Sequence, residues 1–377
     1  MVYLDYNATT PLAEEVLEAM MPYLAEHYGN PSSIHSAGRN ARAAVDNARD
    51  SLAGLLGVRS HEIIFTGGGT EANNLAILGL ARAHRAKGAH LITCATEHHA
   101  VLHAFEHLRD REGFEVTILP VNQFGQVDLE QLQDSLRPDT LLLSLMSANN
   151  ETGTLHPILA IAEICRERGV LFHSDMVQSF GKQSPLDTAK VDSISLAAHK
   201  FYGPKGVGAL YLRSGIPLET LHFGGFHENQ RRPGTENVAG IVGLASAASL
   251  VAARMAKEAP RLKELRDELW KNLSGIEGVR NGHPTETLPN TLNVSFPGVK
   301  GETLLIALDL EGLCVSSGSA CMVGSVLPSH VLFAMEVPSE NAQATVRFSL
   351  GHFTNEKEIQ FAAEAVGRVL RQLKAFA

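Results

Sequence analysis

Short apolar runs alternate with helical patterns between about residues 60 and 212. The runs are apolar throughout rather than alternately apolar and polar, which is typical of strands covered on both faces. Repeated strand–helix units predict an α/β fold with a mainly parallel, doubly wound sheet. The predicted strands are EIIFT, HLITC, FEVTILP, TLLLSLM, VLFHSD, SISLAA and VGALYL, with helices near Thr70, through Val101 and from Pro157.

The pattern changes after a long helical stretch from near Asn237 to Leu273. Strand-like segments TLNVSF, LCVSS and TVRFSL follow, with helices from Gly301 and from Asn355 to the end. This part resembles a smaller α+β unit. We therefore expect a large domain over residues 15–250 and a small domain formed by residues 1–14 and 251–377.

Composition is that of a soluble globular enzyme, with 44% hydrophobic and 19% charged residues in a chain of 377. The net charge is −9 and basic residues are scattered, so no nucleic-acid groove is expected. No apolar run is long enough to span a bilayer, and the N-terminal MVYLDYNATTP lacks the layout of a signal peptide. We expect a cytoplasmic protein without membrane or nucleic-acid partners.

The chain has four cysteines, none in a CxxC pair. Cys94 and Cys165 lie in apolar or helical patterns and are expected to be buried thiols, and Cys314 is expected in a strand. Cys321 follows SSGSA and precedes the glycine-containing, proline-bounded MVGSVLPSH. We expect Cys321 on a loop, where a thiol can be exposed and reactive.

The segment TGGGTEANN, residues 66–74, follows a predicted strand and opens a helix. Glycines such as Gly69 let backbone N–H groups approach an anion, and Thr70 is expected to cap the helix and offer its hydroxyl. The helix start adds roughly half a positive charge. This predicts a phosphate site that is not a Walker loop, since no GK[ST] follows. Glycine-rich turns with a Thr cap also occur without a ligand.

Two further segments carry chemistry. In VLFHSDMVQSFGK, residues 170–182, Asp175 ends a strand at the carboxyl edge of the sheet, where ligands bind. A buried carboxylate requires a cation. A protonated pyridine nitrogen would supply one, and Gln178 could donate to a ring oxygen. Taken alone, an Asp here is more often the cap of a following helix.

In SLAAHKFYGPKGVGALYL, residues 195–212, Lys200 follows a buried strand. Burial favours the neutral amine that forms a Schiff base, although a solvated lysine is the ordinary alternative. Lys205 is interpreted as an ordinary turn lysine. A phosphate site, a strand-end Asp and a buried Lys, in this order, fit the fold that holds pyridoxal 5'-phosphate.

The sequence then resembles, nearly end to end, the cysteine desulfurases of the NifS/IscS type in the class V aminotransferase family. This family has the pyridoxal-phosphate fold type I. The resemblance is carried by YLDYNATTP, YGNPSSIHSAGRNAR, FTGGGTEANNLAI, TEHHAV, NNETG, HSDMVQSFGK, AHKFYGPKGVGALY, RRPGTENVAGIVG, NVSF, SSGSAC, PSHVL and VRFSLGHFT.

The resemblance implies roles around the cofactor ring. Lys200 would form the Schiff base and later move protons. His98 would stack on the ring and act as an acid or base, Asp175 would pair with the ring nitrogen, and Gln178 would contact the phenolic oxygen. No metal is implied.

It also implies the phosphate and substrate contacts. Thr70 and His199 would hold the phosphate, and Thr235 would do so from the neighbouring subunit of a homodimer with shared sites. Asn150 and Arg347 would bind the substrate carboxylate, for which a guanidinium fork is well suited.

The implied reaction converts L-cysteine to L-alanine and leaves a persulfide on Cys321. The sulfur would pass to an acceptor protein, such as an iron–sulfur cluster scaffold or a thiolation protein. Attack requires the thiolate, so we expect a site that assists deprotonation of Cys321. The SSGSAC form resembles the group that hands sulfur to acceptor proteins.

Three features depart from the family's commonest pattern. Ala197 stands where many relatives have a phosphate-binding Ser, and Phe226 interrupts a usual run of three glycines. The chain ends at RVLRQLKAFA, without the longer C-terminal extension of relatives that serve the housekeeping iron–sulfur scaffold. The acceptor is therefore left open.

Other functions fit some of the same sequence features. A transaminase, a kynureninase-like hydrolase or a selenocysteine lyase would use the same fold. A persulfide relay without catalysis is disfavoured because Lys200 and Asp175 are both present. A metal-binding protein is suggested by His99, His103 and His107 at helical spacing beside His98. An exposed polar helix face is the favoured interpretation of that cluster.

Overall fold

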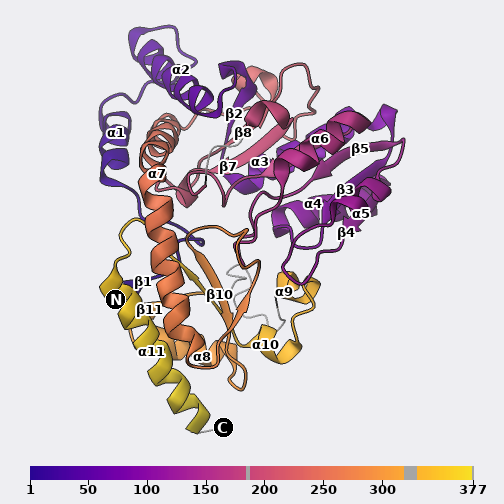
Figure 1. Cartoon of the computed structure of the whole chain (residues 1–377). Coiled ribbons are helices and arrows are strands. Elements are labelled where there is room, and N and C mark those ends of the chain that lie inside the picture. Colours follow the sequence, from indigo (N-terminus) through magenta and orange to yellow (C-terminus); the bar gives the residue numbers. More distant parts are fainter. Residues whose placement is uncertain (184–186, 318–328, 376–377) are drawn as a thin grey trace.

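A computed structural model describes residues 1–183, 187–317 and 329–375. Its centre is a seven-stranded sheet of order β2-β8-β7-β6-β5-β3-β4 (Figure 1). Neighbouring strands are parallel except around β8, which is antiparallel to both β2 and β7. The predicted mainly parallel sheet is confirmed. Its strands are β2 (Ile63–Thr66), β3 (His90–Cys94), β4 (Glu115–Leu119), β5 (Thr140–Ser144), β6 (Leu171–Asp175), β7 (Ser193–Ala197) and β8 (Gly208–Leu212).

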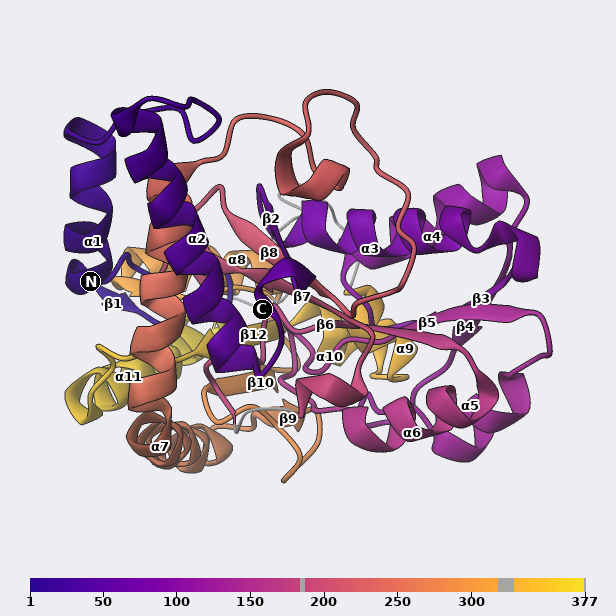
Figure 2. The same ribbon diagram turned by 90° about the horizontal axis from the view of Figure 1, so that it is seen from above.

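Helices cover both faces of this sheet. Figure 2 shows α3 (Gly69–Ala83) and α4 (His99–Glu112) on one face and α5 (Leu129–Ser135) and α6 (Ile158–Arg168) on the other. Most strands are therefore buried along their length, as their apolar sequences predict. The edge strand β4 differs, because only Leu119 of its five residues is fully buried.

Two N-terminal helices, α1 (Glu14–Ala25) and α2 (Ser36–Leu56), were not predicted from the sequence. Both pack against the long helix α7 (Val238–Ser274). In α2 the buried residues Ala41, Val45, Ala48 and Leu52 recur at helical spacing and form one apolar stripe. The helix ends at Gly57, whose φ of 67° is the left-handed conformation that glycine adopts without strain.

The smaller unit is built on a three-stranded antiparallel sheet of order β12-β10-β9. A two-stranded parallel sheet pairs the N-terminal β1 with β11, so the first residues of the chain belong to this unit. Its elements are β1 (Val2–Tyr3), β9 (Val279–Asn281), β10 (Thr291–Ser295), α8 (Gly301–Leu310), β11 (Leu313–Cys314), α9 (His330–Ala334), α10 (Ser339–Gln343), β12 (Thr345–Ser349) and α11 (Glu356–Ala375).

The apolar interior has separate clusters that share α7. Residues of α7 up to Val251 pack with the large sheet, and those from Leu262 pack with the small sheet and α11. Pro260 lies between these two stretches. The domain boundaries 15–250 and 1–14 with 251–377 stay a prediction. Among the described helices only α7 has the length and apolarity of a membrane span, and half of its most apolar stretch is buried within the fold.

Candidate functional site

Polar side chains gather at the carboxyl edge of the large sheet. Asp175 is the last residue of β6, and Lys200 ends a 3-10 turn, η4 (Ala198–Lys200), directly after β7. Gly69 begins α3 after β2, and His98 caps α4 after β3. In a parallel sheet these ends meet at one edge, so residues as far apart in the sequence as Gly69 and Lys200 share one site.

The N-terminal segment holds Lys200. Its amine donates to the main-chain oxygens of Asn7 at 2.7 Å and Ala8 at 2.9 Å. Lys200 is only half-buried, although it follows a fully buried strand. The block YLDYNATTP contributed to the family resemblance, but the sequence did not indicate that it reaches Lys200.

Asp175 is a buried carboxylate with neutral partners. One oxygen accepts from the backbone N–H of Val177 at 2.8 Å, and the other accepts from the Asn73 amide at 2.6 Å. The helix-cap alternative is wrong, because the residues after Asp175 form turns as far as residue 183.

The charges of Asp175 and Lys200 have opposite effects on the pKa of His98. Burial lowers the pKa of its imidazole, the Asp175 charge opposes this shift, and the Lys200 charge adds to it. The ring Nδ1 accepts from the backbone N–H of Ala100 at 3.0 Å. The neutral ring therefore carries its proton on Nε2, the nitrogen that remains for a ligand.

An open cleft of about 830 Å³ lies beside these groups. Its volume is within the range of roughly 300–1,000 Å³ that small ligands occupy in proteins. The start of α3 forms part of its wall, and the first N–H groups of a helix have no partners within that helix. The cleft is lined by Ala8, Thr9, Gly67, Gly68, Gly69, Thr70, Glu71, Asn74, His199, Lys205, Gly206, Leu221 and His222.

The structure gives the surroundings of two predicted phosphate residues, Thr70 and His199, and of Lys205. Thr70 lines the cleft but is the second residue of α3, and Gly68 occupies the cap position, so the predicted Thr70 cap is wrong. The ring of His199 contacts the Thr9 hydroxyl at 3.2 Å, and burial with three nearby lysines lowers its pKa to about 4. Lys205, interpreted as an ordinary turn lysine, also lines the cleft.

The predicted substrate residues meet on the side of the small sheet. Arg347, in β12, is 2% exposed and donates to the main-chain oxygen of Asn150 at 3.0 Å. Its second nitrogen donates to Asp5 at 2.7 Å. This carboxylate partner was not predicted from the sequence, because Asp5 lies 342 residues away along the chain.

Gln178 and Asn7 form the link between the two sides. The Gln178 amide nitrogen donates to the main-chain oxygen of Asn7 at 2.9 Å, and its oxygen accepts from Lys182 at 2.9 Å. Neither Asn7 nor Lys182 was predicted to be functional. Both lie within segments that contributed to the resemblance, so the segments were found but the side chains were not.

Three predicted positions lie outside the cleft or outside the described residues. Thr235 is exposed on the loop before α7 and does not line the cleft of its own chain. Phe226, 82% exposed, lies on the same stretch of chain. Cys321 lies outside the described residues.

The described residues on either side of positions 318–328 connect to the substrate side. Ser316 exchanges backbone hydrogen bonds with Arg347, and the Ser329 hydroxyl donates to Glu151, the neighbour of Asn150. Ser316 therefore contacts Arg347, which is predicted to hold the substrate carboxylate, and Ser329 contacts the direct neighbour of Asn150.

The predictions for Cys94, Cys165 and Cys314 are confirmed. Cys94 and Cys165 are buried, and burial raises the pKa of both thiols, to about 12 for Cys165. Cys314 lies in β11, as predicted. These thiols are poor nucleophiles because the thiolate is the reactive form.

The histidine cluster does not form a metal site in the described parts of the chain, where no group of three or more His, Cys, Asp or Glu could hold an ion. The rings of His99 and His103 are 5.0 Å apart, whereas His107 pairs with Glu112 at 3.2 Å.

Comparison with known proteins agrees with this geometry. The family model of the class-V aminotransferases matches residues 2–361. The chain is 49% identical to a cysteine desulfurase IscS of Dictyoglomus turgidum, over 99% of this chain and 95% of the relative. A solved NifS-like protein superposes with a TM-score of 0.93 at 38% identity, covering 99% of this chain and 100% of its own.

A structure of SspA in complex with cysteine superposes with a TM-score of 0.82 at 36% identity, covering 93% of this chain and 99% of its own. These matches extend over nearly the whole chain, as the ordered sequence blocks predicted. The chain belongs to the class-V aminotransferase family.

Proposed function

We propose that this chain is a cysteine desulfurase that uses pyridoxal 5'-phosphate to convert L-cysteine to L-alanine, with the sulfur left as a persulfide on Cys321. One observation carries the proposal. The Lys200 amine, the Asp175 carboxylate and the His98 ring converge at one sheet edge, in a chain 49% identical to a relative named as a cysteine desulfurase.

The residues fit the cofactor. Asp175 is a buried carboxylate whose two partners are neutral, so a protonated ring nitrogen would supply the cation that it requires. The cleft contains the start of α3 for a phosphate, and Lys200, which follows the cleft residue His199, would bind the aldehyde. When bound, pyridoxal phosphate withdraws electrons from the substrate Cα.

The protein groups then act on the substrate. Arg347 would bind the carboxylate of cysteine with both nitrogens of its fork, and Asn150 would bind beside it. The Lys200 Nζ would take the proton from the substrate Cα and later return a proton to the product. His98, with its proton on Nε2, would donate to the reacting end of the substrate.

The sulfur step requires Cys321. Its thiolate would attack the substrate sulfur, so that an S–S bond forms as the substrate C–S bond breaks. The bonding electrons of the C–S bond remain with the carbon fragment, which takes up protons to become alanine. The net reaction is L-cysteine plus the Cys321 thiol giving L-alanine plus the Cys321 persulfide.

The finer assignments belong to the same proposal. Thr235 would contact the phosphate of a partner subunit in a homodimer, which agrees with its exposure outside its own cleft. A sulfur-acceptor protein in the cytoplasm would receive the outer sulfur of the Cys321 persulfide. Gly69, Thr70 and His199 would hold the phosphate within the chain.

The test is the Cys321→Ser variant. We expect it to retain the cofactor and its visible absorption band, while sulfide release from L-cysteine in the presence of a thiol falls to background. Cys314→Ser is the matched control, because Cys314 lies in β11, and it should keep wild-type activity. Sulfide release by Cys321→Ser at the wild-type rate would overturn the proposal.

A further inference from the structure

A second lysine, Lys182, lies beside the candidate site and has no role in the proposed reaction. It follows Gly181, whose φ is +73° and whose missing Cβ would stand 2.6 Å from Val251. Glycine permits both this left-handed turn and this close approach to α7. The turn directs the Lys182 amine into the interior, toward Gln178 and Asn7.

Two amide oxygens converge on this amine. The Lys182 Nζ is 2.9 Å from the Gln178 Oε1 and 3.2 Å from the Asn7 Oδ1. The orientation of each amide is fixed independently. The Gln178 nitrogen donates to the main-chain oxygen of Asn7, and the Asn7 nitrogen donates to that of Asn150 at 3.2 Å. Main-chain oxygens only accept, so both amide oxygens must face Lys182.

The chemistry of the amine matches these two acceptors. Burial lowers the pKa of Lys182 well below its usual value, and the positive charges of Lys200 and Arg347 add to the effect. In either charge state the amine has at least two N–H bonds, one for each amide oxygen.

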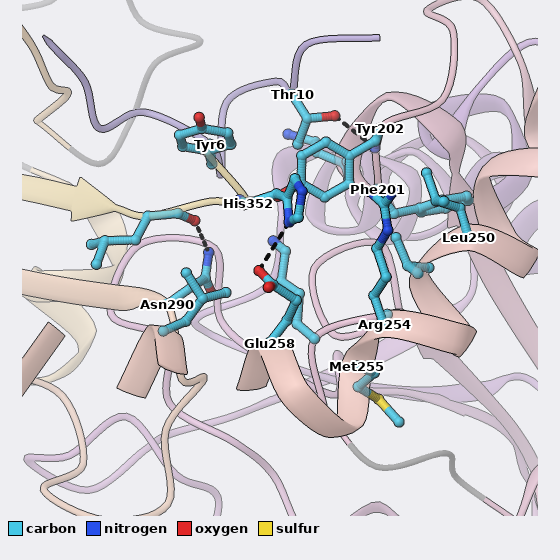
Figure 3. Close-up of a pocket in the computed structure, with 16 residues that line it drawn as sticks. Tyr6, Thr10, Phe201, Tyr202, Leu250, Arg254, Met255, Glu258, Asn290 and His352 are labelled. Carbon is cyan, nitrogen blue, oxygen red and sulfur yellow. Dashed lines mark hydrogen bonds and ion pairs between the residues drawn. The ribbon is translucent and has the colours of Figure 1, made fainter. Parts of the chain in front are cut away.

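The surroundings of Lys182 are a narrow cavity that it shares with Lys200. Figure 3 shows residues that line this cavity, among them Tyr6 and Tyr202, with Leu250 and Met255 contributed by α7. In the described structure the hydrogen bonds of the Lys182 amine go to Gln178 and Asn7.

We propose that Lys182 is a positioning residue that holds the Gln178 and Asn7 amides, so that Gln178 presents an N–H to the phenolic oxygen of the cofactor. The Gln178 nitrogen has two N–H bonds, and one is used by Asn7. The second remains for the cofactor. Asn7 in turn keeps its main-chain oxygen against the Lys200 amine. This inference rests on the proposed function for the identity of the cofactor.

The experiment is a double-mutant cycle of Lys182→Met and Gln178→Met, with cofactor binding as the measurement. Apoprotein is titrated with pyridoxal phosphate, and the dissociation constant and visible absorption band are recorded. Each single variant should weaken binding about fivefold to tenfold, the effect of one lost buried hydrogen bond, and should shift the band in the same direction. The double variant should bind no more weakly than Gln178→Met alone.

Lys190→Met is the matched control. Lys190 ends the turn η3 (Thr188–Lys190) and pairs with Glu163 at 3.7 Å near the surface, so its removal should leave the dissociation constant within about twofold. Fluorescence of the single tryptophan, Trp270, reports whether each variant folds. If Lys182→Met does not fold, Lys182→Gln, which keeps one donor, takes its place in the cycle with a smaller expected effect.

The outcomes separate this inference from the proposed function. Unchanged binding in Lys182→Met, or a double variant that multiplies the two single effects, would overturn the positioning role. A wild-type protein that binds the cofactor but releases no sulfide would overturn the proposed function and leave this inference standing. A wild-type protein that binds no cofactor would overturn both.

Discussion

The two sheets place their functional groups differently. In the seven-stranded sheet they lie at the carboxyl ends of strands, with Asp175 last in β6 and Lys200 three residues after β7. In the three-stranded sheet Arg347 is the middle residue of β12, opposite Asn293 of β10. One sheet therefore presents groups from its edge, and the other presents a group from within a strand.

The difference separates reactivity from orientation. At a strand end, loops and helix starts bring neutral partners and leave a charge available for a ligand, as at Asp175. Within β12 the backbone of Arg347 is held by β10 on one side and Ser316 on the other. Such a guanidinium is suited to fixing a carboxylate in one direction, and less suited to taking part in proton transfer.

The largest effect is expected from the strand end. Asp175→Asn keeps the shape but removes the charge that would keep the cofactor ring protonated. We expect kcat for sulfide release to fall about 10²- to 10³-fold, in the range of a lost electrostatic contact to the transition state. Steady-state kinetics with L-cysteine, alongside the visible spectrum, measures this.

Asp192→Asn is the control for the opposite edge of the same sheet, where Asp192 precedes β7 and accepts from Phe172. It should leave kcat close to wild type. Asp175→Asn with nearly normal kcat would mean that the strand-end carboxylate does not act on the cofactor.

A smaller effect, of a different kind, is expected from within β12. Arg347→Lys keeps the charge but loses the two-pronged contact with a carboxylate. We expect KM for L-cysteine to rise about tenfold to a hundredfold, with kcat much less affected. Arg266→Lys, at a strongly buried arginine in α7, is the matched control for packing. Equal falls in kcat and kcat/KM would show that Arg347 acts in the chemistry instead.

The smallest effect concerns Glu97, a second acid at the edge of the large sheet. Glu97 is fully buried, one of its oxygens has no hydrogen-bond partner in the described structure, and burial followed by the Asp175 charge raises its pKa well above 4.5. The folded protein therefore keeps this proton, while the unfolded chain loses it above about pH 4.5. Wild-type stability should fall as pH rises through this range.

Glu97→Gln lacks this dependence. Its stability relative to wild type should rise by about 1.4 kcal/mol per pH unit from about pH 5 up to the raised pKa that Glu97 has in the fold, measured as thermal midpoints across buffers. Glu106→Gln, an exposed position on α4, is the control and should show no such trend. A difference between Glu97→Gln and wild type that stays flat with pH would mean that Glu97 ionises freely in the fold.

The sequence predicted what depends on local pattern. The central strands and α7 are apolar segments with clear period and length, and Asp175 and Lys200 follow from their places at strand ends. Cys94 and Cys165 were correctly predicted to be buried for the same reason.

What the sequence could not predict depends on distant contacts. Asp5 and Asn7 gain their roles because the N-terminal strand pairs with β11 and carries the following residues between the two sheets. Asn73 faces Asp175 only because α3 packs over the ends of β6 and β7. The partners of Lys182 are likewise set by tertiary packing, and no spacing rule indicates them.

The helix α7 has a consequence for how the chain can be divided. Its 37 residues span about 55 Å, and its two ends bury apolar side chains in different interiors. Cutting the chain near Pro260 would expose apolar side chains in each fragment. It would also remove the continuous helix that connects the two parts of the fold. We therefore expect the two parts to fold together as one chain, because each apolar interior is completed by residues of the same helix.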